Sequence, residues 1–256
     1  MSGHTKPIVA PSELDAAIEA IDAVEGWLSD EQAAMLWRGA RALPEPALVV
    51  EIGSYRARST IVLASALGER GEVVAIDPHA GNDRGPRQWE GPAAAGQADH
   101  ETFNANLERA GVRDRVRHVR IPSAAAGGEV EGEIDLLYID GSHRYRAALS
   151  DIDSWGGRVH PGGELLIHDC FSSIGVTLAL LVRLVPGGAF RYLGRAGSMA
   201  RYRREPVEGT ERVANAGRQL AQLGWFARNL VVKLAVVLRL RPLARLAGQR
   251  ELHWPY

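Results

Sequence analysis

Three apolar stretches of this chain stop at acidic residues, and this pattern restricts the fold more than any other feature. The stretches and the residues that end them are 73–76 before Asp77, 134–139 before Asp140, and 163–167 before His168 and Asp169. Short runs rich in β-branched and other apolar residues predict buried strands. Because the ends of parallel strands meet at one edge of a sheet, we expect these acids to line a common cleft.

Helix and strand patterns alternate along the middle of the chain. Strands are predicted at 47–52, 73–76, 115–119, 134–139 and 163–167, helices at 60–67, 100–110, 144–155 and 172–185, and a hairpin at 190–193 with 198–202. A chain of 256 residues that is 46% hydrophobic can bury the core of one such domain. We therefore expect a Rossmann-like, doubly wound α/β sheet that an antiparallel hairpin completes.

Helical additions flank this core at both ends of the chain. Ser12 and Ser29 precede apolar residues at helical spacing, which predicts two helices within residues 12–43, with Trp27 and Trp37 as packing residues. The expected parts are an N-terminal helical cap at 1–46, a central α/β domain at 47–205, and a basic and apolar helical extension at 206–256.

Charge and cysteine usage exclude several classes of protein. The net charge of -1 gives no general reason to expect a nucleic-acid partner. The single cysteine, Cys170, excludes an intrachain disulfide framework and fits a reducing compartment. Residues 1–7 lack the basic and apolar regions of a secretory signal. We expect a cytoplasmic protein.

The turn after the first strand predicts a nucleoside site. Gly53 lets the backbone approach a ligand, and the following helix presents free N–H groups to an anionic group. The dinucleotide fingerprint needs three glycines, so NAD(P) ranks below other nucleoside cofactors. Asp77 is placed to accept hydrogen bonds from ribose hydroxyls. Glu51, a carboxylate between Val50 and Ile52, requires a partner.

Other polar segments carry weaker signals. Residues 80–98 show no periodicity, which predicts either a flap over the cleft or a disordered segment. Asp151 and Asp153 are expected on the exposed part of their helix, and His118 and His160 on the surface.

From Val49 to Tyr202 the chain resembles a class I S-adenosylmethionine-dependent methyltransferase, whose seven-stranded sheet has an antiparallel last strand. Residues 51–59 (EIGSYRARS) look like the E-x-G-[S/T]-Y-x-G-x-S loop of catechol-type, metal-dependent O-methyltransferases. The segment 140–143 (DGSH), followed by Tyr145, Asp151 and Trp155, then by 161–163 (PGG) and 168–169 (HD), is similar to bacterial methyltransferases that act on sugars and antibiotics.

This resemblance implies roles for individual residues. The cofactor would be S-adenosylmethionine, with Asp77 at its ribose and Ser123 near its adenine, and with Glu51 and Asp140 also in the cofactor site. The residues implied at its methionine end are Gly53, Ser54, Tyr55 and Ser59.

The resemblance also implies a Mg²⁺ site, with Asp140 and Asp169 as ligands. Ala57 replaces a loop glycine of the family, and Cys170 stands where those enzymes carry an asparagine ligand. A thiol suits Mg²⁺ badly, so His168 is the candidate third ligand, and a metal-free reaction stays open.

Methyl transfer from a sulfonium needs an aligned acceptor that loses its proton. We expect His143 to be the general base, and Asp140 and Asp169 to bind the cation or to orient His143 and the acceptor. The alternative for His143 is a turn residue that caps the next helix.

The tail between residues 212 and 250 carries six basic residues besides Arg212 and Arg250, no acidic ones, and many apolar ones. Its uncharged runs are shorter than a membrane-spanning helix requires. We expect packing on the domain or on a second subunit as a homo-oligomer first, and contact with an anionic membrane surface second.

The predicted activity is methyl transfer to a hydroxyl of a sugar or another small polyhydroxylated molecule, so the partner is a small-molecule or glycan acceptor. The alternatives are N-methylation of a small molecule and a non-catalytic scaffold that binds nucleosides.

Overall fold

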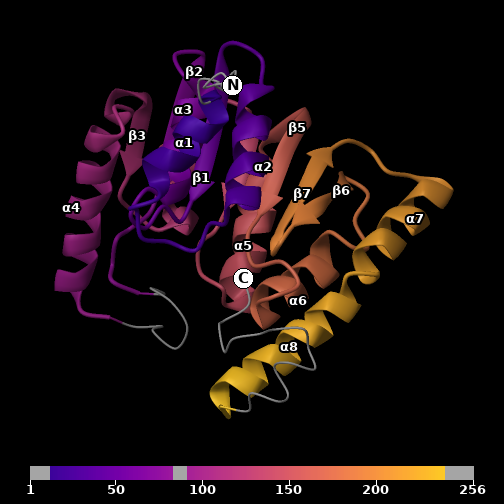
Figure 1. The fold of residues 1–256 in the computed structure, drawn as a ribbon. Coiled ribbons are helices and arrows are strands. Elements are labelled where there is room, and N and C mark those ends of the chain that lie inside the picture. Colours follow the sequence, from indigo (N-terminus) through magenta and orange to yellow (C-terminus); the bar gives the residue numbers. More distant parts are fainter. Residues whose placement is uncertain (1–11, 83–90, 240–256) are drawn as a thin grey trace, which may run out of the picture.

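The structure, a computed structural model, describes residues 12–82 and 91–239 (Figure 1). The start of the chain, the centre of the predicted flap (83–90) and the end of the tail (240–256) lie outside the described residues. The strands are β1 (Ala47–Ile52), β2 (Gly71–Ile76), β3 (Val116–Val119), β4 (Ile134–Ile139), β5 (Val159–Ile167), β6 (Phe190–Ala196) and β7 (Met199–Arg204). The helices are α1 (Glu13–Ile21), α2 (Asp30–Arg41), α3 (Arg58–Leu67), α4 (Ala93–Arg109), α5 (Tyr145–Gly156), α6 (Ile174–Arg183), α7 (Gly209–Leu220) and α8 (Leu223–Val237), with 3₁₀ turns η1 (Arg113–Arg115) and η2 (Ser123–Gly128).

The seven strands form one sheet in the order β3-β2-β1-β4-β5-β7-β6. The pairs from β3 to β5 are parallel, whereas β7 runs antiparallel to both β5 and β6. This arrangement confirms the predicted Rossmann-like sheet with an antiparallel last strand. The strand order reverses between β1 and β4, and ligands bind at such a switch point in open α/β sheets.

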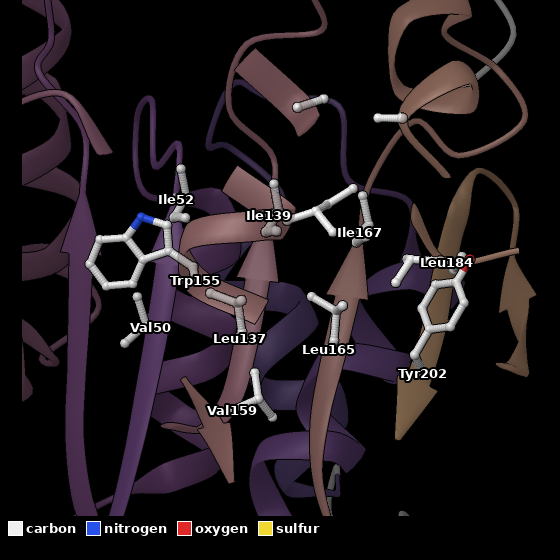
Figure 2. Close-up of a cluster of buried hydrophobic side chains, with 14 of the residues drawn as sticks. Val50, Ile52, Leu137, Ile139, Trp155, Val159, Leu165, Ile167, Leu184 and Tyr202 are labelled. Atoms are coloured by element: carbon white, nitrogen blue, oxygen red, sulfur yellow. The ribbon is translucent and has the colours of Figure 1, made fainter. Parts of the chain in front are cut away.

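Both faces of the sheet are covered by helices, which explains why its central strands are apolar along most of their length. Figure 2 shows one face, where side chains from three strands form a cluster with Trp155 of α5 and with Leu184, beyond α6, which lies next to Tyr202 of β7. These strand residues are Val50 and Ile52 of β1, Leu137 and Ile139 of β4, and Leu165 and Ile167 of β5. The alternate residues pack on the other face against α1 to α4.

The N-terminal helices begin where the sequence predicts. Ser12 and Ser29 each form a capping box, with Asp15 and Gln32 respectively. Arg58, the first residue of α3, donates to the carbonyl oxygens of Ile21, Val24 and Leu28. The loop between α1 and α2 is therefore fastened to the start of α3, next to the turn that follows β1.

Helix α4 begins at Ala93, so residues 93–98, predicted as part of a flap or disordered segment, are helical. The lack of periodicity reflects an alanine- and glycine-rich first turn rather than a missing helix.

The tail forms α7 and α8. The stretch Gly209–Val237 is long and apolar enough to cross a membrane by length and composition, contrary to our interpretation of its sequence. Helices that pack on a protein body also pass this test. Asn229, Val232 and Ala235 of α8 are buried against the rest of the chain.

Candidate active site

A cavity of about 480 Å³ lies beyond the ends of β1, β2 and β4. Its volume falls within the range of small-molecule sites. It joins residues that are far apart in the sequence, including most of those predicted for the cofactor. These are Gly53, Ser54, Tyr55, Ser59, Asp77, Ser123 and Asp140, and His143 lines the cavity with them.

Gly53 brings the loops after β1 and β4 into contact. Its φ is +86°, and a Cβ there would lie 2.3 Å from the carbonyl oxygen of Asp140. Only glycine fits such a close approach without displacing the backbone. Ala57, at the position where the family has a second glycine, adopts φ +72° with its methyl group buried. The loop thus keeps the left-handed turn at a cost in strain.

The carboxylate of Asp77 holds this loop in place. Its Oδ2 accepts hydrogen bonds from the backbone N–H groups of Ser54 and Tyr55, both at 2.9 Å, and its Oδ1 accepts from the N–H of His79 at 2.8 Å. A carboxylate has about four acceptor positions. Asp77 therefore orders the turn between β1 and α3. It can accept one further hydrogen bond, for example from a ribose hydroxyl, rather than two.

Glu51 lies behind the cavity wall. Its side chain is fully buried, is not part of the cavity lining, and accepts hydrogen bonds from the hydroxyls of Ser59 and Thr60. Burial raises the pKa of Glu51 to about 7, although these hydroxyls oppose the shift. Glu51 therefore lies outside the cavity lining, contrary to its expected place in the cofactor site, and is linked to the lining through its hydrogen bond with Ser59. Thr60, its second partner, had no signal in the sequence.

The far end of the cavity is closed by Ser123 and Asp151. Ser123 Oγ donates to Asp151 Oδ1 at 2.6 Å, and Trp155 Nε1 donates to the Ser123 carbonyl at 3.2 Å. Asp151 is 5% exposed, and burial raises its pKa to about 6. The prediction of an exposed Asp151 is wrong. Its position four residues before Trp155, on the same helical face, was the available signal.

The N-terminal cap closes the opposite end. Trp27, expected only to pack, lines the cavity and stacks on Tyr55 with ring centroids 5.5 Å apart. Arg56 forms ion pairs with Glu25 on the cap and with Asp99 on α4. No local pattern marks Trp27, because its partner lies on another segment.

Two histidines and two aspartates form a cluster where β4 and β5 end. His143 Nε2 lies 2.9 Å from Asp169 Oδ2 and 3.8 Å from Asp140 Oδ1. His168 Nδ1 lies 3.3 Å from Asp140 Oδ1, and the hydroxyl of Tyr138 donates to Asp140 Oδ2 at 3.0 Å. Asp140 and His143 line the cavity, whereas Asp169 and His168 are buried behind them.

The cluster pairs each carboxylate with an imidazole. Burial alone would lower the pKa of His143, but Asp169 and Asp140 outweigh it and raise that pKa to about 10. The pKa of Asp169 is held well below its usual value by the histidines despite burial. The two carboxylates therefore favour the protonated form of the His143 imidazole, whereas a general base works best with a pKa near 7.

The donor set fits a hard divalent cation. One ligand atom each from Asp140, His143 and Asp169 lies within 4.8 Å of the others, so His143 rather than the expected His168 completes the set. Carboxylate oxygens are the ligands that Mg²⁺ prefers. Cys170 is not part of it: the thiol is buried, burial raises its pKa, and it donates to the Ile167 carbonyl.

Known proteins share this fold. Residues 50–170, just under half of the chain, match the family model described as a methyltransferase domain. Cofactor-bound Rv0187 from MTB is 23% identical, with a TM-score of 0.55 over 77% of this chain and 92% of that chain. The O-methyltransferase TomG from Streptomyces achromogenes, in complex with SAM, is 17% identical, with a TM-score of 0.54 over 77% of this chain and 91% of that chain. The O-methyltransferase from Bacillus cereus, in complex with SAH, is 17% identical, with a TM-score of 0.54 over 78% of this chain and 93% of that chain.

Strand order, the inserted antiparallel β7 and the cavity beyond β1 and β4 define a class I methyltransferase fold. The family model described as a methyltransferase domain matches residues 50–170 of this same region. The chain therefore has the class I methyltransferase fold.

Proposed function

We propose that this protein transfers the methyl group of S-adenosylmethionine to a hydroxyl of a sugar or another small polyhydroxylated molecule. The observation that carries the proposal is the pairing of His143 with Asp169 at 2.9 Å, beside Asp140, at the wall of a cofactor-sized cavity. Two of the similar structures are named O-methyltransferases, which supports oxygen as the acceptor.

The cavity suggests how each end of the donor is held. The backbone of residues 53–55 and the hydroxyl of Ser59 would contact the methionine part, with Trp27 and Tyr55 stacked beside it. Asp77 would accept from a ribose hydroxyl. Ser123 and Asp151 would face the adenine, where a carboxylate oxygen can accept from the exocyclic amine.

The cluster prepares the acceptor. When bound, the donor supplies an electrophilic methyl group and a divalent cation supplies positive charge to the acceptor oxygen. Asp140, His143 and Asp169 would hold the cation. Without the cation, Asp169 would instead orient the imidazole of His143 as the base, because a ring nitrogen bound to the cation cannot also take up a proton. A positioned base contributes on the order of 10² to 10⁴ in rate. Because Asp169 and Asp140 raise the pKa of His143, its role as a base requires the imidazole to be deprotonated before the acceptor reacts.

Replacing His143 tests this assignment. In His143→Gln we expect turnover to fall by about 100-fold or more, because the acceptor hydroxyl loses its base or its cation ligand. Donor affinity should not change. The measurement is transfer from methyl-labelled S-adenosylmethionine to a panel of sugars and polyols, with donor binding followed by calorimetry.

The matched control is His160→Gln. His160 also pairs with an aspartate, at 3.0 Å from Asp135, but lies at the beginning of β5. It should keep full activity. Wild-type turnover in His143→Gln would remove His143 from the mechanism, and donor binding without transfer to any hydroxyl would favour the nucleoside-binding scaffold.

A further inference from the structure

The loop that carries Asp169 has an unusual backbone. It connects β5 to α6 through residues 168–173, and both Asp169 and Phe171 have positive φ, +56° and +55°. An aspartate tolerates this left-handed conformation, but a phenylalanine rarely adopts it. Such a conformation persists only where the surrounding structure holds it. The position of Asp169 relative to His143 depends on that support.

Part of the support comes from within the loop. The carbonyl oxygen of Asp169 accepts from the N–H groups of Ser172 and Ser173 at 3.2 and 2.9 Å. The rings and side chains of Cys170, Phe171 and Ser172 are fully buried. These bonds close a tight turn, yet they do not involve the carbonyl groups of Phe171 and Ser172.

Those two carbonyl groups are bound by α8. Asn229 Nδ2 donates to the Phe171 carbonyl at 3.1 Å, and Lys233 Nζ donates to the Ser172 carbonyl at 2.7 Å. Asn229 and Lys233 are four residues apart, so they project from one face of the helix. Asn229 is fully buried, and its Oδ1 accepts from Arg228, which fixes the orientation of the amide.

Helix α8 lies outside the seven-stranded core. Figure 1 shows α7 and α8 as a long arm that leaves the β6–β7 edge and passes α6. The arm follows the last strand of the sheet, so the catalytic loop is held by a segment that the fold itself does not require.

We propose that Asn229 and Lys233 are positioning residues for Asp169. They bind consecutive carbonyl groups of the loop at 168–173, hold it in its left-handed conformation, and so keep the Asp169 carboxylate against His143. This role rests on the proposed function, in which the pair of His143 and Asp169 prepares the acceptor.

The test uses the full chain labelled with ¹⁵N in its histidines. The hydrogen-bonded ring N–H of His143 should give a low-field proton signal, which His143→Gln identifies by its loss. We expect Asn229→Ala and Lys233→Met to lose or shift this signal, and amide exchange in residues 169–173 to become about tenfold faster. Lys233→Arg, which keeps a cationic donor, should restore the signal.

Leu234→Ala is the matched control, because Leu234 neighbours Lys233 on α8 and is 51% exposed. It should leave the signal and the exchange rates unchanged. A purely structural role would lower thermal stability in Asn229→Ala and Lys233→Met while the His143 signal stayed in place, and that result overturns the proposal. Lys233 is only partly buried, so Lys233→Met remains informative if Asn229→Ala does not fold.

Donor binding separates this proposal from the proposed function. Calorimetry with S-adenosylmethionine on the wild-type protein tests the function, whereas the His143 signal reports the loop without any transfer reaction. Loss of the signal with intact donor binding supports the positioning role. An unchanged signal in both variants refutes it even where the protein is an active methyltransferase.

Discussion

Glu51 is a carboxyl group kept away from solvent between β1 and the start of α3. Ser59 and Thr60 donate to its two oxygens, so the side chain ties the strand to the helix that borders the cavity. Burial disfavours its charged form and raises its pKa from 4.5 to about 7. This residue makes the stability of the fold depend on pH.

The sign of that dependence follows from the shift. Between about pH 4.5 and pH 7 the unfolded chain has lost the Glu51 proton while the folded chain retains it, so stability falls as pH rises through this window. The shift corresponds to about 3 kcal/mol. In Glu51→Gln, we expect the free energy of unfolding to exceed that of the wild type at pH 8 but not at pH 4.

Urea denaturation at both pH values measures the effect. Glu131→Gln, at an exposed position before β4, is the control and should not alter the pH dependence. If Glu51→Gln had the same free energy of unfolding as the wild type at every pH, Glu51 would not be the buried acid described above.

At the scale of elements, the conformation of the turn between β1 and α3 depends on one side chain from another element, Asp77. Tyr55 and Ala57 both have positive φ, and Asp77 at the end of β2 binds two successive N–H groups of this turn. The carboxylate therefore orders this turn before any ligand binds.

Asp77→Asn should weaken donor binding by about 10- to 100-fold, because one amide oxygen replaces two charged acceptors and hydrogen bonds to charged groups contribute about 1.5–3 kcal/mol. Turnover at saturating donor should change little. Asp114→Asn, an exposed residue before β3, serves as the control in the same titration. Equal affinities of the two variants for the methyl donor would show that Asp77 does not order the turn between β1 and α3.

The elements were largely predictable, since their signals are local. Apolar runs predicted the strands, and the serines at positions 12 and 29 predicted the helix starts. The acids after β2, β4 and β5 meet at one edge of the sheet, as expected. The place of Trp27 in the cavity and the contacts of Asn229 and Lys233 with the loop of Asp169 were not predictable. Their roles come from contacts between segments more than 25 residues apart, which no periodicity records.

At the scale of the whole molecule, residues from both flanking segments contact the site of the central domain predicted at 47–205. The cap at 1–46 supplies Trp27 to the cavity, and the extension at 206–256 supplies Asn229 to the loop of Asp169. These boundaries remain a prediction. The contacts across them mean that removing either end should alter the site as well as the surface.

The central claim is that the cavity beyond β1, β2 and β4 binds the methyl donor with its reactive end toward His143. A crystal structure of the full chain grown with S-adenosylmethionine and Mg²⁺ tests it most directly. We predict the ribose on Asp77, the adenine beside Ser123 and Asp151, and the methyl group facing the cluster of Asp140, His143 and Asp169. A donor bound elsewhere, or with its methyl group turned away from His143, would contradict the account.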